Sequence, residues 1–154
     1  MQMVKRLLAM RDRLLALARK LDWLPLLLVR ASLAAVFVPS GWGKLHDLGK
    51  VTGFFTEIGI PAPHFNAVLV ALSELGCGAL LLVGLVSRLA AMPLVISMTV
   101  AIITAKRADI SGVTDLFAVD EFIYIVMAIV VIALGPGAVS IDGLLARRSR
   151  IARD

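Results

Sequence analysis

The sequence has few of the residues from which redox and hydrolytic sites are built. It contains one cysteine, Cys77, which excludes an internal disulfide and a Cys-x-x-Cys pair within the chain. Its two histidines, His46 and His64, fall in one polar loop. It has no Ser-His-Asp order, phosphate-binding glycine loop or dinucleotide fingerprint. The sequence therefore contains no recognisable redox centre or nucleophilic site of its own.

Charge is also scarce, because charged residues make up 18% of the chain and hydrophobic residues 60%. Soluble domains are about half apolar, and a chain of 154 residues cannot hide the surplus inside a folded core. The net charge of +5 does not indicate nucleic-acid binding, since the basic residues flank apolar runs instead of covering a soluble face. The composition therefore predicts a membrane protein.

Four apolar runs approach the length of about 20 residues that a helix needs to cross a bilayer. They cover residues 23–43, 65–86, 89–105 and 122–141. Backbone groups in lipid must bond to one another, so we expect helices. The sequence predicts an all-α fold with a four-transmembrane-helix bundle over residues 23–141. The first run has no small-residue cleavage pattern soon after it, so we expect a span and not a signal peptide.

Lysine and arginine are divided unevenly between the two sides of such a bundle. One side comprises residues 1–22, the turn at Arg88 and the tail 142–154. These segments hold six, one and four basic residues, eleven in all. The loops on the other side, 44–64 and 106–121, hold four. Cytoplasmic loops are enriched in Lys and Arg. Both termini are therefore predicted to be cytoplasmic, in a bacterial inner membrane.

Two segments outside the spans are amphipathic. In residues 1–22 the apolar side chains share one side of a helix and the basic ones the other, with Arg11 as an exception. The apolar side consists of Val4, Leu7, Leu8, Leu14, Leu15, Ala18 and Leu21. We expect an interfacial helix on the anionic inner leaflet, with docking to a partner as the alternative. Apolar residues at helical spacing between Leu48 and Ile58 predict a short helix over the outer mouth of the bundle.

Two charged residues, Arg30 and Glu74, lie within predicted spans, where charges are costly and usually face the bundle interior. Small residues on the same helix face as Glu74 allow a close neighbour there. They are Ala67, Ala71 and Gly78. From the helical rise, the two charges differ in depth by roughly 8 Å. We therefore predict an Arg30–Glu74 ion pair, which either fixes helix register or makes Glu74 a proton-accepting or ligand-binding carboxylate. Snorkelling of Arg30 alone is the alternative.

Further candidate residues lie at the ends of the spans. Lys44 follows a glycine-rich stretch and either binds an anionic group at the outer mouth or anchors to headgroups. Arg88 is expected to determine topology. We predict no metal site, because His46 and His64 fit no known ligand spacing, and the absence of His in the spans excludes a bis-His haem.

The last apolar run continues only weakly beyond Leu134, where turn and capping residues begin. Gly135-Pro136-Gly137 is predicted to stop the fourth helix. Ser140 is then predicted to cap a helix that begins at Ile141, with Asp142 in its first turn.

These pieces, in this order, resemble the DoxX family of small bacterial membrane proteins. The matching stretches are Arg30, residues 41–44, Phe54-Phe55 before residues 59–61, Glu74 with Gly76 and Gly78, residues 84–88 and residues 135–142. The resemblance implies a four-helix membrane bundle. Some relatives, including DoxD-type proteins, are subunits of membrane oxidoreductases that pass electrons from sulfur compounds to quinone, and others are linked to thiol and oxidative-stress complexes. Carried onto this chain, the candidate positions are Arg30, Lys44, Glu74 and Arg88.

Three functions follow as hypotheses. The first is an accessory membrane subunit of an oxidoreductase complex, with no intrinsic cofactor and a quinone held near Glu74 and Arg30. The second is a non-catalytic anchor or assembly factor, which predicts a solidly packed bundle. The third is a carrier of small solutes or lipids. Pro93 and the Gly76/Gly78 pair are only weak signs of the broken helices of better-known carriers, and no convincing internal repeat is present.

Overall fold

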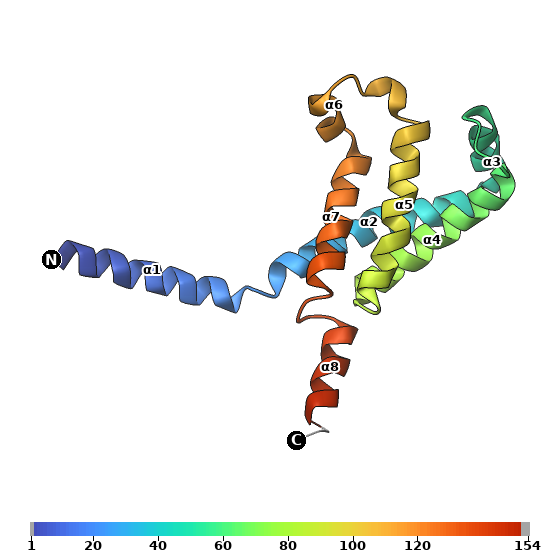
Figure 1. The fold of residues 1–154 in the computed structure, drawn as a ribbon. Coiled ribbons are helices and arrows are strands. Elements are labelled where there is room, and N and C mark those ends of the chain that lie inside the picture. Colours follow the sequence, from blue (N-terminus) through green and yellow to red (C-terminus); the bar gives the residue numbers. More distant parts are fainter. Residues whose placement is uncertain (1, 152–154) are drawn as a thin grey trace.

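The computed structural model describes residues 2–151, and these form a chain of helices joined by short turns (Figure 1). Helix accounts for 83% of the structure, and the described residues contain no strand. The elements are α1 (Gln2–Lys20), α2 (Leu24–His46), α3 (Leu48–Glu57), α4 (Pro63–Val83), α5 (Ser87–Thr104), η1 (Arg107–Asp109), α6 (Val113–Ala118), α7 (Asp120–Leu134) and α8 (Ile141–Ile151). Met1 and residues 152–154, which include Arg153 of the predicted basic tail, lie outside the described residues.

Three of the described helices, α2, α4 and α5, are long and apolar enough to cross a membrane. The helix α7 has 15 residues and ends at Leu134, which confirms the predicted stop at Gly135-Pro136-Gly137, whereas the bounds predicted for the fourth span continue to Ile141. It stops because Gly135 adopts φ +87°, a conformation outside the helix, and Pro136 follows. The predicted cap of the next helix is confirmed, since Ser140 Oγ accepts the backbone N–H of Gly143 at 3.0 Å.

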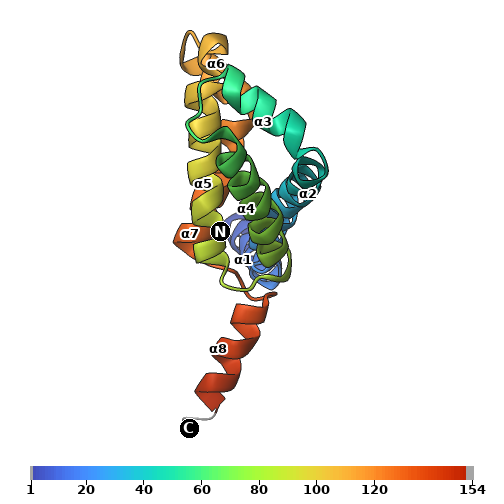
Figure 2. The ribbon, with the colours of Figure 1, turned by 90° about the vertical axis from the view of Figure 1, so that its right-hand side faces the viewer.

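The long helices pack as two pairs, α2 with α4 and α5 with α7, which cross steeply (Figures 1 and 2). Glycine permits the close approach of α2 to α4. A Cβ atom at Gly41 would lie 2.4 Å from the backbone nitrogen of Leu75, and one at Gly78 would lie 3.0 Å from the Val38 side chain. Small residues allow such backbone contact between membrane helices.

The apolar core lies where the two pairs cross. Its largest members are Leu33 and Phe37 of α2, Leu81 of α4 and Leu94 of α5, and the ring of Phe37 meets that of Tyr124 edge-on at 5.6 Å. Many other large apolar side chains on α4, α5 and α7 remain exposed. This division is expected of helices whose outer surfaces face lipid instead of water.

Candidate functional site

Glu74 is buried between α4 and α2, with 1% of its surface exposed. Lys44 Nζ donates to both carboxylate oxygens at 2.5 Å, and Ser40 Oγ donates to Oε2 at 2.8 Å. Ser40 and Lys44 are one helical turn apart on α2, so both face the same point on α4. The predicted inward direction of Glu74 is confirmed, because Ala67, Ala71 and Gly78 of its helix face are buried with it.

Lys44 reaches Glu74 because α2 continues to His46, beyond the predicted end of the span at Gly43. The last turn is extended by His46, whose ring contacts the Trp42 ring at 4.5 Å. The Lys44 side chain is 28% exposed, whereas Glu74 is enclosed. The anionic group that Lys44 binds within the described structure is therefore a carboxylate of the protein itself.

The predicted Arg30–Glu74 pair is wrong, because the structure gives the two residues different partners. The guanidinium of Arg30 packs on Gly84, where an added Cβ would lie 2.5 Å from Nη1. Glu74 comes ten residues earlier on the chain, or about 15 Å along a helix. The depths estimated from the sequence were counted from Trp23 for Arg30 and from Val86 for Glu74, on the assumption that these two residues lie at the same height in the membrane. In the structure α4 already ends at Val83 beside Arg30, which nearly doubles the separation.

Arg30 donates instead to backbone carbonyls of the loop that follows α7. Its Nη1 donates to Pro136 O, and its Nη2 donates to Val139 O at 2.8 Å. Arg30 is 1% exposed, so these bonds are shielded from water. Arg88 Nη2 donates to Ala133 O at 3.4 Å, near the carboxyl end of α7, where carbonyls lack helical partners.

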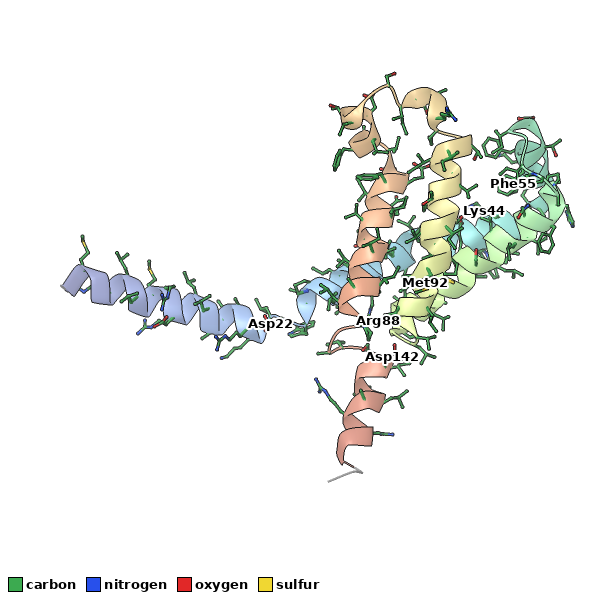
Figure 3. The ribbon with its side chains drawn as sticks, viewed as in Figure 1. Asp22, Lys44, Phe55, Arg88, Met92 and Asp142 are labelled. Atoms are coloured by element: carbon green, nitrogen blue, oxygen red, sulfur yellow. The ribbon has the colours of Figure 1, made fainter. Side chains whose placement is uncertain are left out.

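Asp142 joins this same region to the start of α5. Its carboxylate accepts the backbone N–H groups of Val86 at 3.0 Å and Ser87 at 3.2 Å, and its own N–H donates to Gly84 O at 3.1 Å. We call the end of the bundle formed by Arg30, Gly84, Arg88 and Asp142 the closed end. Figure 3 shows Arg88 and Asp142 here, far from Lys44 and Phe55 at the opposite end.

At the opposite end, which we call the open end, a cavity of about 970 Å³ adjoins Ser40, Lys44 and Glu74. Four helices and α3 contribute to its walls, which are mostly apolar. The helix α3 supplies Val51, Phe54 and Phe55, and Ile58 directly after it also lines the cavity. Beyond Ser40, Lys44 and Glu74, the polar residues on the walls include Ser73, Ser97 and Tyr124, which sequence reasoning missed. No spacing pattern in the sequence distinguishes these three from other span residues.

The cavity opens sideways between α4 and α5. Leu69 of α4 and Ile96 and Val100 of α5 line it, and they are also 52%, 65% and 42% exposed. These three residues belong to helices that are long and apolar enough to span a membrane. This side of the cavity therefore borders the outer surface of two helices that can face lipid.

The two histidines lie apart from these groups. A ring nitrogen of His46 is 2.9 Å from Trp42 O, and one of His64 is 3.4 Å from Thr52 Oγ1. Within residues 2–151 no three His, Cys, Asp or Glu side chains are grouped as metal ligands would be.

The spanning helices and the charges enclosed between them define a polytopic α-helical membrane protein. The chain belongs to the DoxX family, whose family model matches residues 25–107 and so covers Arg30, Lys44, Glu74 and Arg88. It is 34% identical over 140 residues to the uncharacterized membrane protein Rv3486 of Mycobacterium tuberculosis, covering 79% of this chain and 81% of that one. It is 27% identical over 132 residues to the inner membrane protein YqjF of Escherichia coli, covering 84% and 98%. No solved structure matches.

Proposed function

We propose that the chain is an accessory membrane subunit of an oxidoreductase complex and that it binds a quinone in the cavity at the open end. The observation that carries the proposal is an apolar cavity with a lateral opening that adjoins a buried, paired carboxylate. Small-molecule sites are mostly apolar with a few placed polar groups. A quinone combines the same two features, because its ring carries two polar carbonyl oxygens and its tail is apolar.

The residues at the open end suit the proton chemistry of a quinone. Reduction of a quinone to a quinol takes two electrons and two protons. The electrons would come from a redox centre of a partner subunit, in the sulfur, thiol or oxidative-stress metabolism that the family resemblance implies. Lys44 can donate a hydrogen bond to a quinone carbonyl oxygen. Glu74 would take up a proton from water and pass it to the quinone as a general acid, once for each of the two protons. The partial exposure of Lys44 provides the route by which protons reach Glu74 from water.

The proposal includes a topology in which α7 is the fourth crossing and both termini are cytoplasmic in the inner membrane. Packing of α7 along α5 supports a crossing, although its 15 residues span only about 22 Å. The excess of basic residues in the terminal segments and at Arg88 supports the orientation. In this arrangement the closed end is cytoplasmic, and the open end faces the periplasm.

The cavity argues against the two other functions. An anchor or assembly factor requires only a solidly packed bundle and gives no reason for an apolar space beside Glu74. A carrier needs access from both sides of the membrane. At the closed end Arg30 is buried and bonded to backbone carbonyls. The separate hollow of about 400 Å³ beside Arg88 and Asp142 shares no lining residue with the cavity at the open end, which argues against a passage.

The test is quinone binding to the full chain in nanodiscs, measured by equilibrium titration with decylubiquinone and with a short-chain menaquinone. Wild-type protein is expected to bind one of them, and Glu74→Gln to bind it at least tenfold more weakly. Ile96→Trp is expected to obstruct the opening and weaken binding likewise. Ile129→Trp is the matched control, because Ile129 is exposed on α7 and is not among the cavity-lining residues. Absence of binding to the wild type, or equal binding by all four proteins, would refute the proposal.

A further inference from the structure

The N-terminal helix α1 lies outside the bundle that forms the cavity. Figure 1 shows it extending away from the crossed pairs. A short turn joins it to α2, in which Leu21 N donates to Ala18 O and Leu24 N donates to Leu21 O, both at 2.9 Å. Every described side chain of α1 is exposed, including large apolar ones such as Leu14 and Leu17. Nothing in the bundle therefore covers the apolar surface of this helix.

The surface of α1 is divided lengthwise into an apolar half and a basic half. At 100° per residue the large apolar side chains fall within one half-turn. The exposed ones are Met3, Leu7, Leu8, Met10, Leu14, Leu15 and Leu17. Arg6, Arg13, Arg19 and Lys20 fall on the other half, and none of them makes an ion pair with a described residue.

The one exception in the sequence pattern, Arg11, is resolved by the structure. Arg11 Nε and Nη2 both donate to Asp12 Oδ1, at 3.1 and 2.8 Å. Asp12 lies on the basic half, so the Arg11 guanidinium is directed away from the apolar surface and its charge is neutralised. The apolar half is therefore continuous along the helix, and the unpaired charges on the other half are all positive.

We propose that α1 binds along its length to the surface of an anionic lipid bilayer. Apolar residues on one half and unpaired arginine and lysine on the other match the acyl boundary and the anionic headgroups of such a surface. The tether supports a lipid surface over a protein groove. The three residues between α1 and α2 reach at most about 10 Å, and the exposed Trp23 among them is typical of the membrane interface. The helix is thereby held where the headgroups of the inner leaflet lie.

The test uses full-length protein carrying one spin label, in a Cys77→Ser background that removes the native cysteine. Leu14→Cys labels the apolar half, and Ala16→Cys labels the opposite side. In nanodiscs with one third phosphatidylglycerol, the Leu14 position should collide mainly with oxygen and the Ala16 position mainly with a water-soluble nickel chelate. In phosphatidylcholine alone the difference between the two positions should shrink.

A charge variant tests the electrostatic part of the proposal. Arg13→Gln with Lys20→Gln should shift the equilibrium between bound and lifted α1 by about fivefold for each charge, as about 1 kcal/mol per basic residue implies. Lys106→Gln with Arg107→Gln removes the same net charge outside α1 and should leave the equilibrium unchanged. Equal water access at Leu14 and Ala16 in anionic nanodiscs would overturn the proposal. The proposal would also be overturned if the label at Leu14 were shielded from the nickel chelate equally in anionic and neutral nanodiscs. If shielding required added membrane proteins, the proposal would be overturned in favour of a protein partner. Quinone binding at the open end does not enter this measurement.

Discussion

The two charges buried in the bundle are held in opposite ways at its two ends. At the closed end Arg30 donates to backbone carbonyls, which cannot move away without unfolding the loop that carries them. At the open end Glu74 accepts from the side chains of Ser40 and Lys44, beside an apolar cavity. Side chains can change partners, and a cavity leaves room for a new one. Equal burial thus produces a structural charge at one end and a candidate binding site at the other.

The largest effect should come from Arg30→Met at the closed end. The free energy of unfolding should fall by about 3–5 kcal/mol, because the carbonyls of Pro136 and Val139 lose a charged donor that is itself buried. Reversible unfolding of the full chain in detergent micelles measures the loss. Arg88→Met is the control, since Arg88 is exposed and its bond to Ala133 O is long, at 3.4 Å. Similar losses for both variants would show that Arg30 has no special structural role.

The Lys44–Glu74 pair should give the next largest effect and should respond to a double-mutant cycle. Lys44→Met should cost about 2–3 kcal/mol, because it leaves a buried carboxylate without its cation. Glu74→Gln should cost less, about 1–2 kcal/mol, since Lys44 can turn toward water. The double variant should be less destabilised than the sum of the two. Strict additivity of the unfolding free energies would contradict a direct pair.

Close packing of α2 on α4 is tested by two glycines two residues apart. Gly41→Ala should cost about 2 kcal/mol, because its Cβ would lie 2.4 Å from Leu75 N, and the forced separation should also weaken quinone binding beside Glu74. Gly43→Ala, which meets no described atom within 4 Å, should be neutral or slightly stabilising. Equal melting temperatures for the two variants would show that this contact does not position Glu74.

The smallest effect should come from Asp142→Asn at the closed end. The variant should lose about 1 kcal/mol, because a neutral amide accepts more weakly from the backbone N–H groups at the start of α5. Quinone binding at the open end should remain unchanged, which separates the two ends. Asp109→Asn, an exposed acidic residue in η1, serves as the control. An Asp142→Asn protein that lost quinone binding would show that the ends are coupled.

Several features could be predicted from the sequence because their causes are local. Apolar runs of sufficient length predicted the helices α2, α4 and α5, and Ser140 was correctly assigned as the cap of α8. Small residues on the Glu74 face correctly indicated that this carboxylate points inward. The chain itself also determines that α1 has an apolar half and a basic half, since that division depends only on the spacing of its residues.

The partners of the buried charges were decided only by the tertiary structure. Spacing along one helix does not reveal how far that helix is shifted along its neighbour, and the shift of α4 against α2 separates Arg30 from Glu74 and brings Lys44 to it. The sequence predicted Asp142 only as a residue of the first turn of α8. In the structure its carboxylate also caps α5, which begins 55 residues earlier. The cavity depends on five elements at once. Such features follow from contacts between distant segments, and no single segment contains the information that sets them.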